Sequence, residues 1–258
     1  MLTLKKLEVE GVKLAYAEAG TGRPLVCVHG NFASKRWFTP QLVEPPEGWR
    51  VLALDLPNFA DSDALPGAIS IEGYAEYLKG FIDGLELERP VLLGHSLGGA
   101  VVQTLVSQAP ELAAALLLIA PAPPNGFKTP EETYTYLELF KTNRSLLAQS
   151  LGATMPTRKP SYFEAIVDDA FNMSGAAFTG NARALERYDV TLSLSDIDCS
   201  ALVLHGGRDY LVTEAMAQRT AKVLRGKLEL WPDVGHSPQL ESPQAFNTLL
   251  AEFLQGVS

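Results

Sequence analysis

Ser96 lies in the glycine-rich stretch GHSLGG at residues 94–99, between an apolar strand-like run and a segment with helical spacing. A sharp turn from a strand into a helix has no room for side chains beside it, which accounts for the glycines. In such a turn a serine is held in a strained conformation with its hydroxyl pointing outward, as a nucleophile requires. The alternative is that Ser96 only caps the following helix. We predict that Ser96 is a nucleophile.

A serine hydroxyl is a weak nucleophile near neutral pH and needs a general base. Of the four histidines, His236 is the best candidate, because it follows the last strand-like run and precedes the final amphipathic segment. His29 and His205 each end a strand-like run and are expected to shape loops. His95 adjoins Ser96, where the two side chains would point apart. His236 is therefore predicted to be the base.

An orienting acid is expected next to the base, since a carboxylate that accepts the second imidazole proton fixes the ring. Asp209, at the end of the stretch HGGRD, follows the strand-like run that precedes the last one. Asp198 and Asp233 are weaker candidates, and Asp209 as a surface charge is the alternative. The predicted catalytic set is Ser96, Asp209 and His236.

The segments that must position these residues alternate between strand-like and helix-like patterns. Apolar runs occur at Leu25–Val28, Val51–Leu54, Val91–Leu93, Ala115–Ile119, Ala201–Leu204 and Leu228–Trp231. Apolar residues with helical spacing fill residues 71–85 and 101–106, and residues 1–20 alternate like two strands. This succession predicts an α/β fold with a mostly parallel, doubly wound sheet covered by helices on both faces.

Residues 122–196 interrupt this alternation, because roughly 75 residues pass without a convincing strand. The stretches TPEE (129–132) and SYFE (161–164) have the pattern of capping boxes, and Gly152 and Gly175 lie where helices could end. We expect three or four short helices here, inserted as a lid before the strand near Ala201. The core would then comprise residues 1–121 and 197–258.

The composition limits the partners and the compartment. The 258 residues are 47% hydrophobic and 20% charged with a net charge of −9, which disfavours nucleic acid and anionic membranes as partners. No run is long enough to span a membrane, and residues 1–20 lack the features of a secretion signal. Cys27 and Cys199 are expected to be buried free thiols in a cytoplasmic protein. No metal-ligand cluster or dinucleotide fingerprint is found, so neither a metal nor a cofactor is expected.

Together these motifs resemble the α/β-hydrolase fold family, in its lid-bearing branch of esterases, lactonases and carbon–carbon bond hydrolases. The likeness covers nearly the whole chain. It is carried by the stretches HGNF (29–32), DLPNFADSD (55–63), GHSLGG (94–99), HGGRD (205–209) and GHSPQLESP (235–243). The order Ser96, Asp209, His236 is the order of the family. The resemblance also implies an oxyanion hole formed by the backbone N–H groups of Asn31 and Leu97.

The chain departs from the family pattern at the turn after the predicted fourth strand. Relatives usually have a Gly-x-Gly-x-Ser turn there, whereas this chain has Asn58 and Ala60 at the glycine positions. The turn is therefore expected to be rebuilt. The nucleophile is Ser96, not the aspartate of relatives that cleave carbon–halogen bonds or epoxides. The stretch HGNFAS also lacks the glycine-rich oxyanion motifs of lipases and proline peptidases.

An insertion at this place in an open α/β sheet lies over the carboxyl ends of the strands, so the lid is expected to roof Ser96. Most lid aromatics would form its own core, and some would face an apolar pocket. The pocket candidates are Phe32, Tyr134, Phe140, Phe163, Phe171 and Phe178. The lid residues Arg144, Arg183 and Arg187 are expected on the solvent face, because unpaired buried charge is unfavourable.

The expected function is that of a serine hydrolase that cleaves small, mostly apolar carboxylic esters through an acyl-enzyme intermediate, with only the ester and water as partners. A lactonase, thioesterase or carbon–carbon bond hydrolase would use the same groups. A ligand sensor with slow or absent turnover is the alternative from another class. The sequence does not indicate the natural substrate or the oligomeric state, because fold and catalytic groups are shared by many chemistries.

Overall fold

The predicted sheet is present in the computed structural model, which describes residues 3–195 and 197–257. Its strands are β1 (Thr3–Val9), β2 (Val12–Gly20), β3 (Arg23–Val28), β4 (Trp49–Leu54), β5 (Val91–His95), β6 (Ala115–Ile119), β7 (Ser200–Gly206) and β8 (Lys227–Trp231). They lie in the order β1-β2-β4-β3-β5-β6-β7-β8. The pairs β1–β2 and β2–β4 are antiparallel, and all other pairs are parallel. The α/β fold with a mostly parallel sheet is therefore confirmed.

The central strands are apolar throughout because both of their faces are covered. Every residue of β5 and of β6 is buried. In β3, Val26 and Val28 belong to one hydrophobic cluster, whereas Leu25 and Cys27 belong to the cluster on the other face. This alternation follows from the two-residue period of a strand. It explains why these runs show no polar residues in the sequence.

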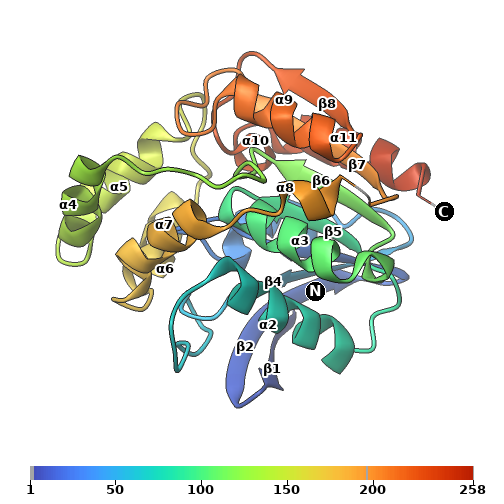
Figure 1. Cartoon of the computed structure of the whole chain (residues 1–258), viewed down its shortest axis with the longest axis horizontal. Coiled ribbons are helices and arrows are strands. Elements are labelled where there is room, and N and C mark those ends of the chain that lie inside the picture. The colour runs from blue at the N-terminus through green and yellow to red at the C-terminus, as the bar shows by residue number, and fades with distance from the viewer. Residues whose placement is uncertain (1–2, 196, 258) are drawn as a thin grey trace.

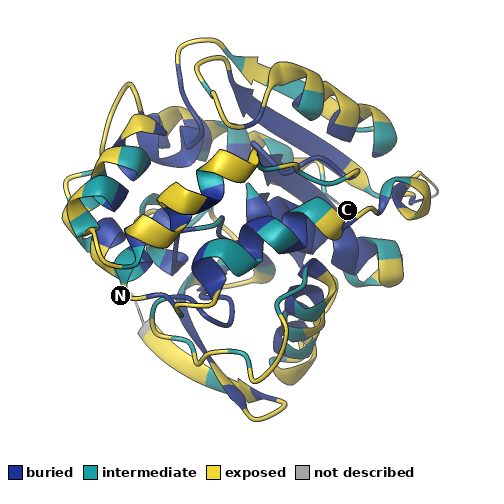
Figure 2. Cartoon of the chain, turned by 60° about the vertical axis from the view of Figure 1, so that its left-hand side comes forward, coloured by how far each residue is buried: buried dark blue, intermediate teal, exposed yellow. Residues whose placement is uncertain are grey.

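Helices cover both faces of the sheet (Figure 1). The core helices and short helical turns are η1 (Lys35–Phe38), α1 (Thr39–Val43), α2 (Ile71–Gly84), α3 (Leu97–Gln108), η2 (Pro110–Leu112), α9 (Glu214–Val223), α10 (Pro238–Glu241) and α11 (Pro243–Gln255). Buried residues of α2, α3 and α9 pack on one face, and those of α1 and α11 pack on the other. The buried strands lie between helices whose outer sides are exposed (Figure 2).

The chain between β6 and β7 forms helices instead of strands. We call residues 122–195 the lid segment; residue 196, the last of the expected range, lies outside the described residues, as do residues 1–2 and 258 of the expected core. The helices of the lid segment are α4 (Glu131–Phe140), α5 (Arg144–Ala153), α6 (Phe163–Phe171), α7 (Ala177–Arg187) and α8 (Thr191–Leu194). The helices α4 to α7 lie together at one end of the sheet (Figure 1). The described lid segment thus has five helices, one more than the expected maximum of four. The additional helix is α8, whose four residues carry no sequence signal.

The two expected capping boxes are wrong. Helix α4 begins at Glu131 after Pro130, and helix α6 begins at Phe163 after Tyr162. The side chains of these two cap residues accept no hydrogen bond from the backbone of the helix. In a capping box the N–H of Thr129 would bond to a glutamate of its own helix. Here it donates to Glu186 Oε1 of α7 at 3.1 Å. Tertiary contacts within the lid segment therefore fix this helix start in place of the local pattern.

Candidate active site

Ser96 occupies a strained turn between β5 and α3. Its backbone has φ 52° and ψ −115°, a conformation that non-glycine residues rarely adopt. A Cβ atom on Gly98 would lie 2.2 Å from the Val28 carbonyl oxygen, and one on Gly94 would lie 2.7 Å from the Gly98 carbonyl oxygen. The glycines are thus required by close backbone packing, as the sequence predicts. The Ser96 side chain makes no capping hydrogen bond to α3, which contradicts the alternative of a helix cap.

His236 and Asp209 form a buried pair beyond the ends of β7 and β8. The His236 Nδ1 atom lies 2.6 Å from Asp209 Oδ2, and the side chains are 7% and 0% exposed. The other carboxylate oxygen of Asp209 accepts hydrogen bonds from the backbone N–H groups of Leu211 and Val212 at 2.8 and 3.1 Å. Burial alone would raise the pKa of Asp209, but His236 and these N–H donors hold the pKa below its ordinary value.

The arrangement leaves one nitrogen of His236 available. Because Nδ1 is bonded to Asp209, only Nε2 can serve as a base. The rings of His236 and His95, the neighbour of Ser96, are 4.9 Å apart. Within the described residues the Ser96 hydroxyl has no hydrogen-bond partner, and His236 is not bonded to it either. The structure therefore brings the three predicted residues into one region and orients the base through the acid.

The turn at Asn31 lies directly against Ser96. A Cβ atom on Gly30 would lie 2.9 Å from the Ser96 Cβ atom. Leu97 is the first residue of α3, where a backbone N–H has no partner within the helix. In the described part of the chain, neither this N–H nor that of Asn31 donates a hydrogen bond to the protein. Two free donors beside the serine are what an oxyanion hole requires.

Two of the other histidines, His29 and His95, hold loops, as predicted for His29 from its strand end. His205 is buried at the end of β7, and its Nδ1 atom has no hydrogen-bond partner among the described residues. The His29 Nε2 atom accepts the Leu56 N–H at 3.0 Å, so its Nδ1 donates to the Gly30 carbonyl at 2.8 Å. His95 Nε2 donates to the His236 carbonyl at 2.9 Å. Burial lowers the pKa of His29 to about 4 and that of His95 to about 3, and it also lowers the pKa of His205.

Glu241 holds the loop that carries His236, a role that sequence analysis missed. One of its carboxylate oxygens accepts the N–H groups of Gly235 and Ser237, on either side of His236, at 2.9 and 3.2 Å. The other oxygen accepts the Thr157 hydroxyl at 2.6 Å and the Thr157 N–H at 3.2 Å. All four partners are donors, which suits a carboxylate. The residue is 4% exposed and lies within the stretch GHSPQLESP, where the signal was a single acidic residue between two prolines.

The lid segment contacts the site directly. The His236 N–H donates to the Thr154 carbonyl at 2.9 Å. On the other side, Asp169 of α6 accepts the Ser34 hydroxyl at 2.6 Å and the Arg36 Nε–H at 2.8 Å. The lid segment is therefore bonded both to the His236 loop and to the loop after β3.

Three of the predicted pocket aromatics lie together. The Phe32 ring packs edge-on against Phe140 of α4 and Phe178 of α7, with ring centroids 5.6 and 5.5 Å apart. Tyr134 instead stacks under the Arg183 guanidinium at 3.5 Å, and Phe163 lies under the Lys159 ammonium at 5.2 Å. Among the described residues, these two and Phe171 make no ring contact with the Phe32 group. Phe32 follows Asn31, so the aromatic group adjoins the candidate oxyanion hole.

The predicted solvent-facing arginines are paired. Arg144 binds the carboxylates of Glu164 and Asp168, and Arg183 binds those of Glu131 and Glu186. Arg187 donates to the backbone carbonyl of Ile69 at 3.4 Å. In the described structure, each of these three guanidinium groups therefore has a hydrogen-bond or ion-pair partner.

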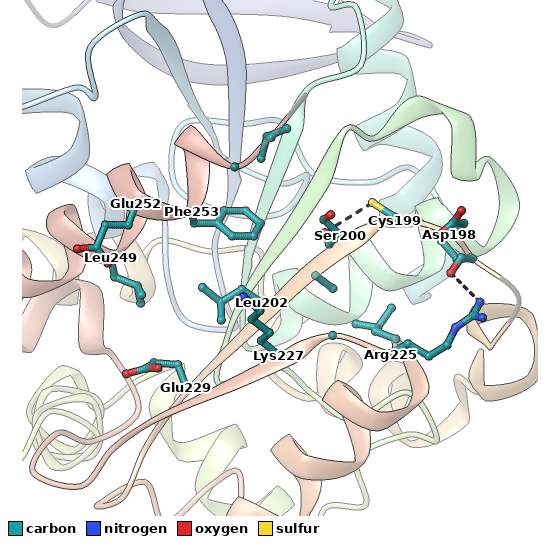
Figure 3. Close-up of a pocket in the computed structure, with 16 residues that line it drawn as sticks. Asp198, Cys199, Ser200, Leu202, Arg225, Lys227, Glu229, Leu249, Glu252 and Phe253 are labelled. Carbon is teal, nitrogen blue, oxygen red and sulfur yellow. Dashed lines mark hydrogen bonds between the residues drawn. The ribbon is translucent and has the colours of Figure 1, made fainter.

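A groove of about 640 Å³ lies away from this site. It is bordered by the amino-terminal ends of β7 and β8 and by α11 (Figure 3), whereas Ser96, Asp209 and His236 follow carboxyl-terminal strand ends. Cys199, one of the two free cysteines, lies at this groove and is half-buried, while Cys27 is fully buried. The groove shares no residue with the candidate active site.

In the described residues, no group of three or more histidine, cysteine or acidic side chains is placed to hold a metal ion. Likewise, none of the described helices has both the length and the apolar character that a membrane span needs.

The fold is that of an α/β hydrolase. The model of the alpha/beta hydrolase family matches residues 25–249, and the chain belongs to this family. It is 26% identical to the AB hydrolase superfamily protein YisY of Bacillus subtilis (strain 168), over 95% of this chain and 96% of that protein. It is 27% identical to a non-heme haloperoxidase of Rhodococcus erythropolis, over 95% of this chain and 97% of that protein.

Solved structures show the same fold. The esterase from Exiguobacterium antarcticum superposes with a TM-score of 0.88 at 23% identity, over 99% of this chain and 100% of that chain. Other similar proteins include a 2-hydroxymuconate semialdehyde hydrolase and an N-acyl homoserine lactonase. Because the related proteins differ in reaction, the family defines a hydrolase and leaves the substrate to the residues around the site.

Proposed function

We propose that this protein is a serine hydrolase that cleaves small, mostly apolar carboxylic esters. The observation that carries the proposal is the buried His236–Asp209 pair, 2.6 Å apart, beside a serine in a strained turn. A structural serine or a surface aspartate would need neither the strain nor the pair. Such a combination is the expected form of an activated nucleophile with an oriented base.

In the proposed reaction, His236 Nε2 takes the proton of the Ser96 hydroxyl while Ser96 Oγ attacks the ester carbonyl carbon. The oxyanion accepts hydrogen bonds from the Asn31 and Leu97 N–H groups. The carbon–oxygen bond to the leaving alcohol then breaks, and the imidazolium returns its proton to that alcohol. Water attacks the acyl-enzyme by the same route and releases the carboxylic acid. Asp209 keeps the imidazole in the tautomer that has Nε2 unprotonated.

The preference for neutral substrates follows from the groups nearest the site. Phe32, Phe140 and Phe178 offer apolar surface, and burial of each additional methylene of a substrate contributes about 0.8 kcal/mol. The lid arginines Arg144 and Arg183 are held in ion pairs with glutamates and aspartates. A substrate carboxylate would have to displace those partners, which disfavours anionic esters.

A lactone, a thioester or a carbon–carbon bond next to a carbonyl presents the same electrophile to Ser96, so these remain alternative substrates. A sensor on the same fold would bind such a molecule and turn it over once or not at all. The free Ser96 hydroxyl and the oriented base favour repeated turnover over the sensor.

The test is a panel of neutral p-nitrophenyl esters, matched esters with a free carboxylate, thioesters and lactones, measured as kcat/KM. We expect many turnovers on p-nitrophenyl acetate or butyrate, with the neutral ester preferred in each matched pair. Ser96→Ala should abolish turnover and keep the circular dichroism spectrum and melting temperature of the native fold.

Full activity in Ser96→Ala would contradict the proposed nucleophile. A higher kcat/KM for thioesters or lactones than for every ester would change the substrate class and keep the mechanism. A consistent preference for the anionic esters would contradict the apolar site and direct attention to the arginines. A single slow event per chain with an altered melting temperature would indicate the sensor.

A further inference from the structure

The turn after β4 departs from the family pattern at Asn58 and Ala60, and the structure shows what replaces the glycines. Asn58 has φ 76° and Ala60 has φ 44°, so both occupy the left-handed region that glycine adopts most readily. Asparagine tolerates this region better than most residues. The backbone of the turn is therefore kept, and Asn58 adds a side chain that a glycine would not have.

The side chain of Asn58 begins a continuous series of hydrogen bonds that ends at Asn31. Asn58 Nδ2 donates to the Tyr74 hydroxyl oxygen at 3.1 Å. The Tyr74 hydroxyl donates to Asn181 Oδ1 at 2.7 Å, and Asn181 Nδ2 donates to Asn31 Oδ1 at 2.8 Å. The series joins four separate parts of the fold: the turn after β4, helix α2, helix α7 of the lid segment and the turn beside Ser96. We call these four residues the amide–tyrosine series.

The direction of every bond in the series is determined from both ends. The backbone N–H of Leu65 donates to the Asn58 side chain at 3.0 Å, so the accepting atom must be the oxygen. At the other end, the backbone N–H of Phe32 donates to the Asn31 side chain at 3.0 Å, so that atom must also be oxygen. The two assignments agree with the same orientation of Asn181 and Tyr74. Every residue of the series is hydrogen-bonded, and the donor and acceptor assignments from its two ends agree. A fully satisfied buried network of this kind fixes the geometry of its members.

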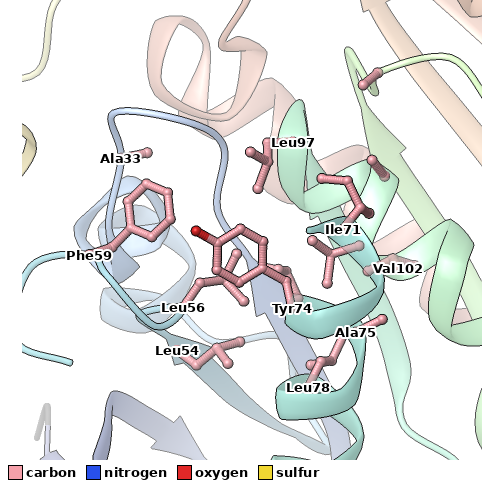
Figure 4. Packing of buried hydrophobic residues seen from close by; sticks show 14 of the residues in the cluster. Ala33, Leu54, Leu56, Phe59, Ile71, Tyr74, Ala75, Leu78, Leu97 and Val102 are labelled. Atoms are coloured by element: carbon pink, nitrogen blue, oxygen red, sulfur yellow. The ribbon is translucent and has the colours of Figure 1, made fainter. Parts of the chain in front are cut away.

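The centre of the series is excluded from water. Tyr74 and Asn181 are 0% exposed, and Asn58 is 4% exposed. Tyr74 is surrounded by apolar side chains, among them Phe59, Ile71 and Leu97, and its hydroxyl oxygen points toward the side where Ala33 and Phe59 lie (Figure 4). Burial raises the pKa of Tyr74, so the hydroxyl keeps its proton and remains a donor. Loss of the Tyr74 hydroxyl or the Asn181 amide leaves a buried polar atom of its neighbour without a partner.

The end of the series constrains the candidate oxyanion hole. Asn31 Oδ1 accepts both the Asn181 amide and the Phe32 N–H, which closes a tight turn in which Phe32 has φ 53°. The Phe32 N–H is thereby occupied, and the Asn31 N–H stays as the free backbone donor of the turn. The Phe32 ring packs against Phe140 and Phe178, so the same turn also positions this group of three rings.

We infer that Asn58, Tyr74 and Asn181 are positioning residues that hold the Asn31 N–H in the geometry needed to bind the oxyanion. The inference rests on the proposed function, because it assigns the partner of that N–H. In this proposal the amide–tyrosine series affects the transition state through the Asn31 N–H and does not contact the substrate itself. Because Asn181 belongs to the lid segment, the oxyanion hole is complete only when α7 is seated on the core.

The experiment compares Tyr74→Phe and Asn181→Ala with a matched control, Tyr188→Phe. Tyr188 of the lid segment is also a buried tyrosine, and its hydroxyl donates to the Pro123 carbonyl at 2.6 Å, with the Ala122 carbonyl 3.1 Å away, outside the series. For each variant, kcat and KM for p-nitrophenyl acetate are measured together with the inhibition constant of a trifluoromethyl ketone. The hemiketal that this ketone forms with Ser96 carries an oxyanion.

Complete removal of an oxyanion donor typically costs about 100-fold or more in kcat, so misplacement of one donor should cost on the order of 10-fold. We expect this loss in kcat for Tyr74→Phe and Asn181→Ala, with KM unchanged and with an equal rise in the inhibition constant. Tyr188→Phe should change both constants less than about twofold, although it loses a buried hydroxyl in the same way. In the Asn181→Ala background, Tyr74→Phe should have no further effect, because Tyr74 acts through Asn181.

A structural role alone would lower the melting temperature of all three variants and leave kcat and the inhibition constant as in the wild type; that result would overturn the inference. Additive losses in the double variant would overturn the series as the route. If the wild type hydrolyses no ester, the proposed function fails, and amide hydrogen exchange still tests the series. Exchange of the Phe32 N–H should be slow in the wild type and in Tyr188→Phe, and at least about tenfold faster in Asn181→Ala and Tyr74→Phe. Unchanged protection would overturn the inference.

Discussion

The two loops that face Ser96 are held by different chemistry. The His236 loop is fixed by a carboxylate, Glu241, which accepts four hydrogen bonds with no ion-pair partner among the described residues. The turn at Asn31 is fixed by neutral amides and a phenol. Each arrangement includes a residue of the lid segment, Thr157 in one and Asn181 in the other. The lid segment is therefore part of the support on both sides of the serine.

The difference corresponds to what each loop must present. In the proposed reaction the His236 ring becomes positively charged, and a nearby carboxylate attracts that charge. In the proposed reaction the Asn31 turn presents a backbone N–H to a developing negative charge, which a carboxylate close by would oppose. The nearest charged group along the chain from that turn, Lys35, is bound by Asp55 at 2.6 Å. Charged support next to the base and neutral support next to the oxyanion therefore suit their separate tasks.

The largest expected effect tests the charged side. Asp209→Asn removes the carboxylate that orients His236 and should lower kcat for p-nitrophenyl acetate by about 10³ to 10⁴-fold, since the imidazole then takes the wrong tautomer. Steady-state kinetics measure the loss, and circular dichroism checks the fold. Asp233→Asn, a change at an exposed aspartate of the same region, serves as the control. A loss below tenfold would show that Asp209 is not the orienting acid.

Glu241→Gln should have the next largest effect. The amide group places a donor against N–H or O–H donors, so buried partners lose their acceptor, at a cost of about 1–3 kcal/mol in the free energy of unfolding. The activity should fall as well, because the backbone on either side of His236 shifts. Urea unfolding and kcat are measured against Glu252→Gln, the same change at an exposed position of α11. Equal stability of the two variants would contradict the support by Glu241.

The free energy of unfolding in acid depends on two buried histidines, one bonded to each of the two loops. The pKa of His95, bonded to the His236 loop, is about 3, and that of His29, bonded to Gly30, is about 4, both below the ordinary 6.5. Below about pH 6.5 the unfolded chain binds protons that the folded chain does not, so the free energy of unfolding falls as the pH falls. From about pH 7 to pH 5.5 the two residues should contribute a decrease of about 2 kcal/mol.

Urea unfolding at the two pH values measures this decrease, and His29→Gln and His95→Gln should each remove about half of it. His205, whose pKa is also lowered, adds to the decrease in the same direction. The lowered pKa of Asp209 acts only at more acidic pH, where its stabilising contribution is lost as the carboxylate is protonated. A wild-type pH dependence in both variants would show that neither histidine stays neutral in the fold.

The smallest expected step, that of one added methylene, concerns the rings of Phe32, Phe140 and Phe178. Phe140→Ala removes a ring that contacts Phe32, so longer acyl chains should gain about fourfold in kcat/KM per methylene, from about 0.8 kcal/mol each. The series of p-nitrophenyl acetate, butyrate and hexanoate measures the shift. Tyr136→Ala on the same helix is the control, because Tyr136 is 55% exposed. The same shift in both variants would place the effect outside the pocket.

The sequence reveals Ser96, Asp209 and His236 because each lies in a local pattern at the end of an apolar run. The sheet is predictable for the same reason, since the strands are short, apolar and regularly spaced. Asn181 has no such pattern, because its partners Tyr74 and Asn31 lie 107 and 150 residues away in the chain. For Glu241, the partner in the lid segment, Thr157, lies 84 residues away. The departure at Asn58 was visible in the sequence, but its partner Tyr74 follows only from the folded arrangement. The failed capping boxes show the same limit, because a glutamate of α7 replaces the local partner of Thr129.

The strand order has a consequence for synthesis of the protein. The strands β3, β4 and β5 are neighbours in the sheet, and β6, β7 and β8 are added in turn toward one edge. A chain that emerges from the ribosome can therefore extend the sheet strand by strand, as domains that fold during synthesis do. The serine is translated long before the proposed base, which follows β8. An incomplete chain thus carries Ser96 without His236, so the proposed reaction can begin only after β8 and the His236 loop have been made.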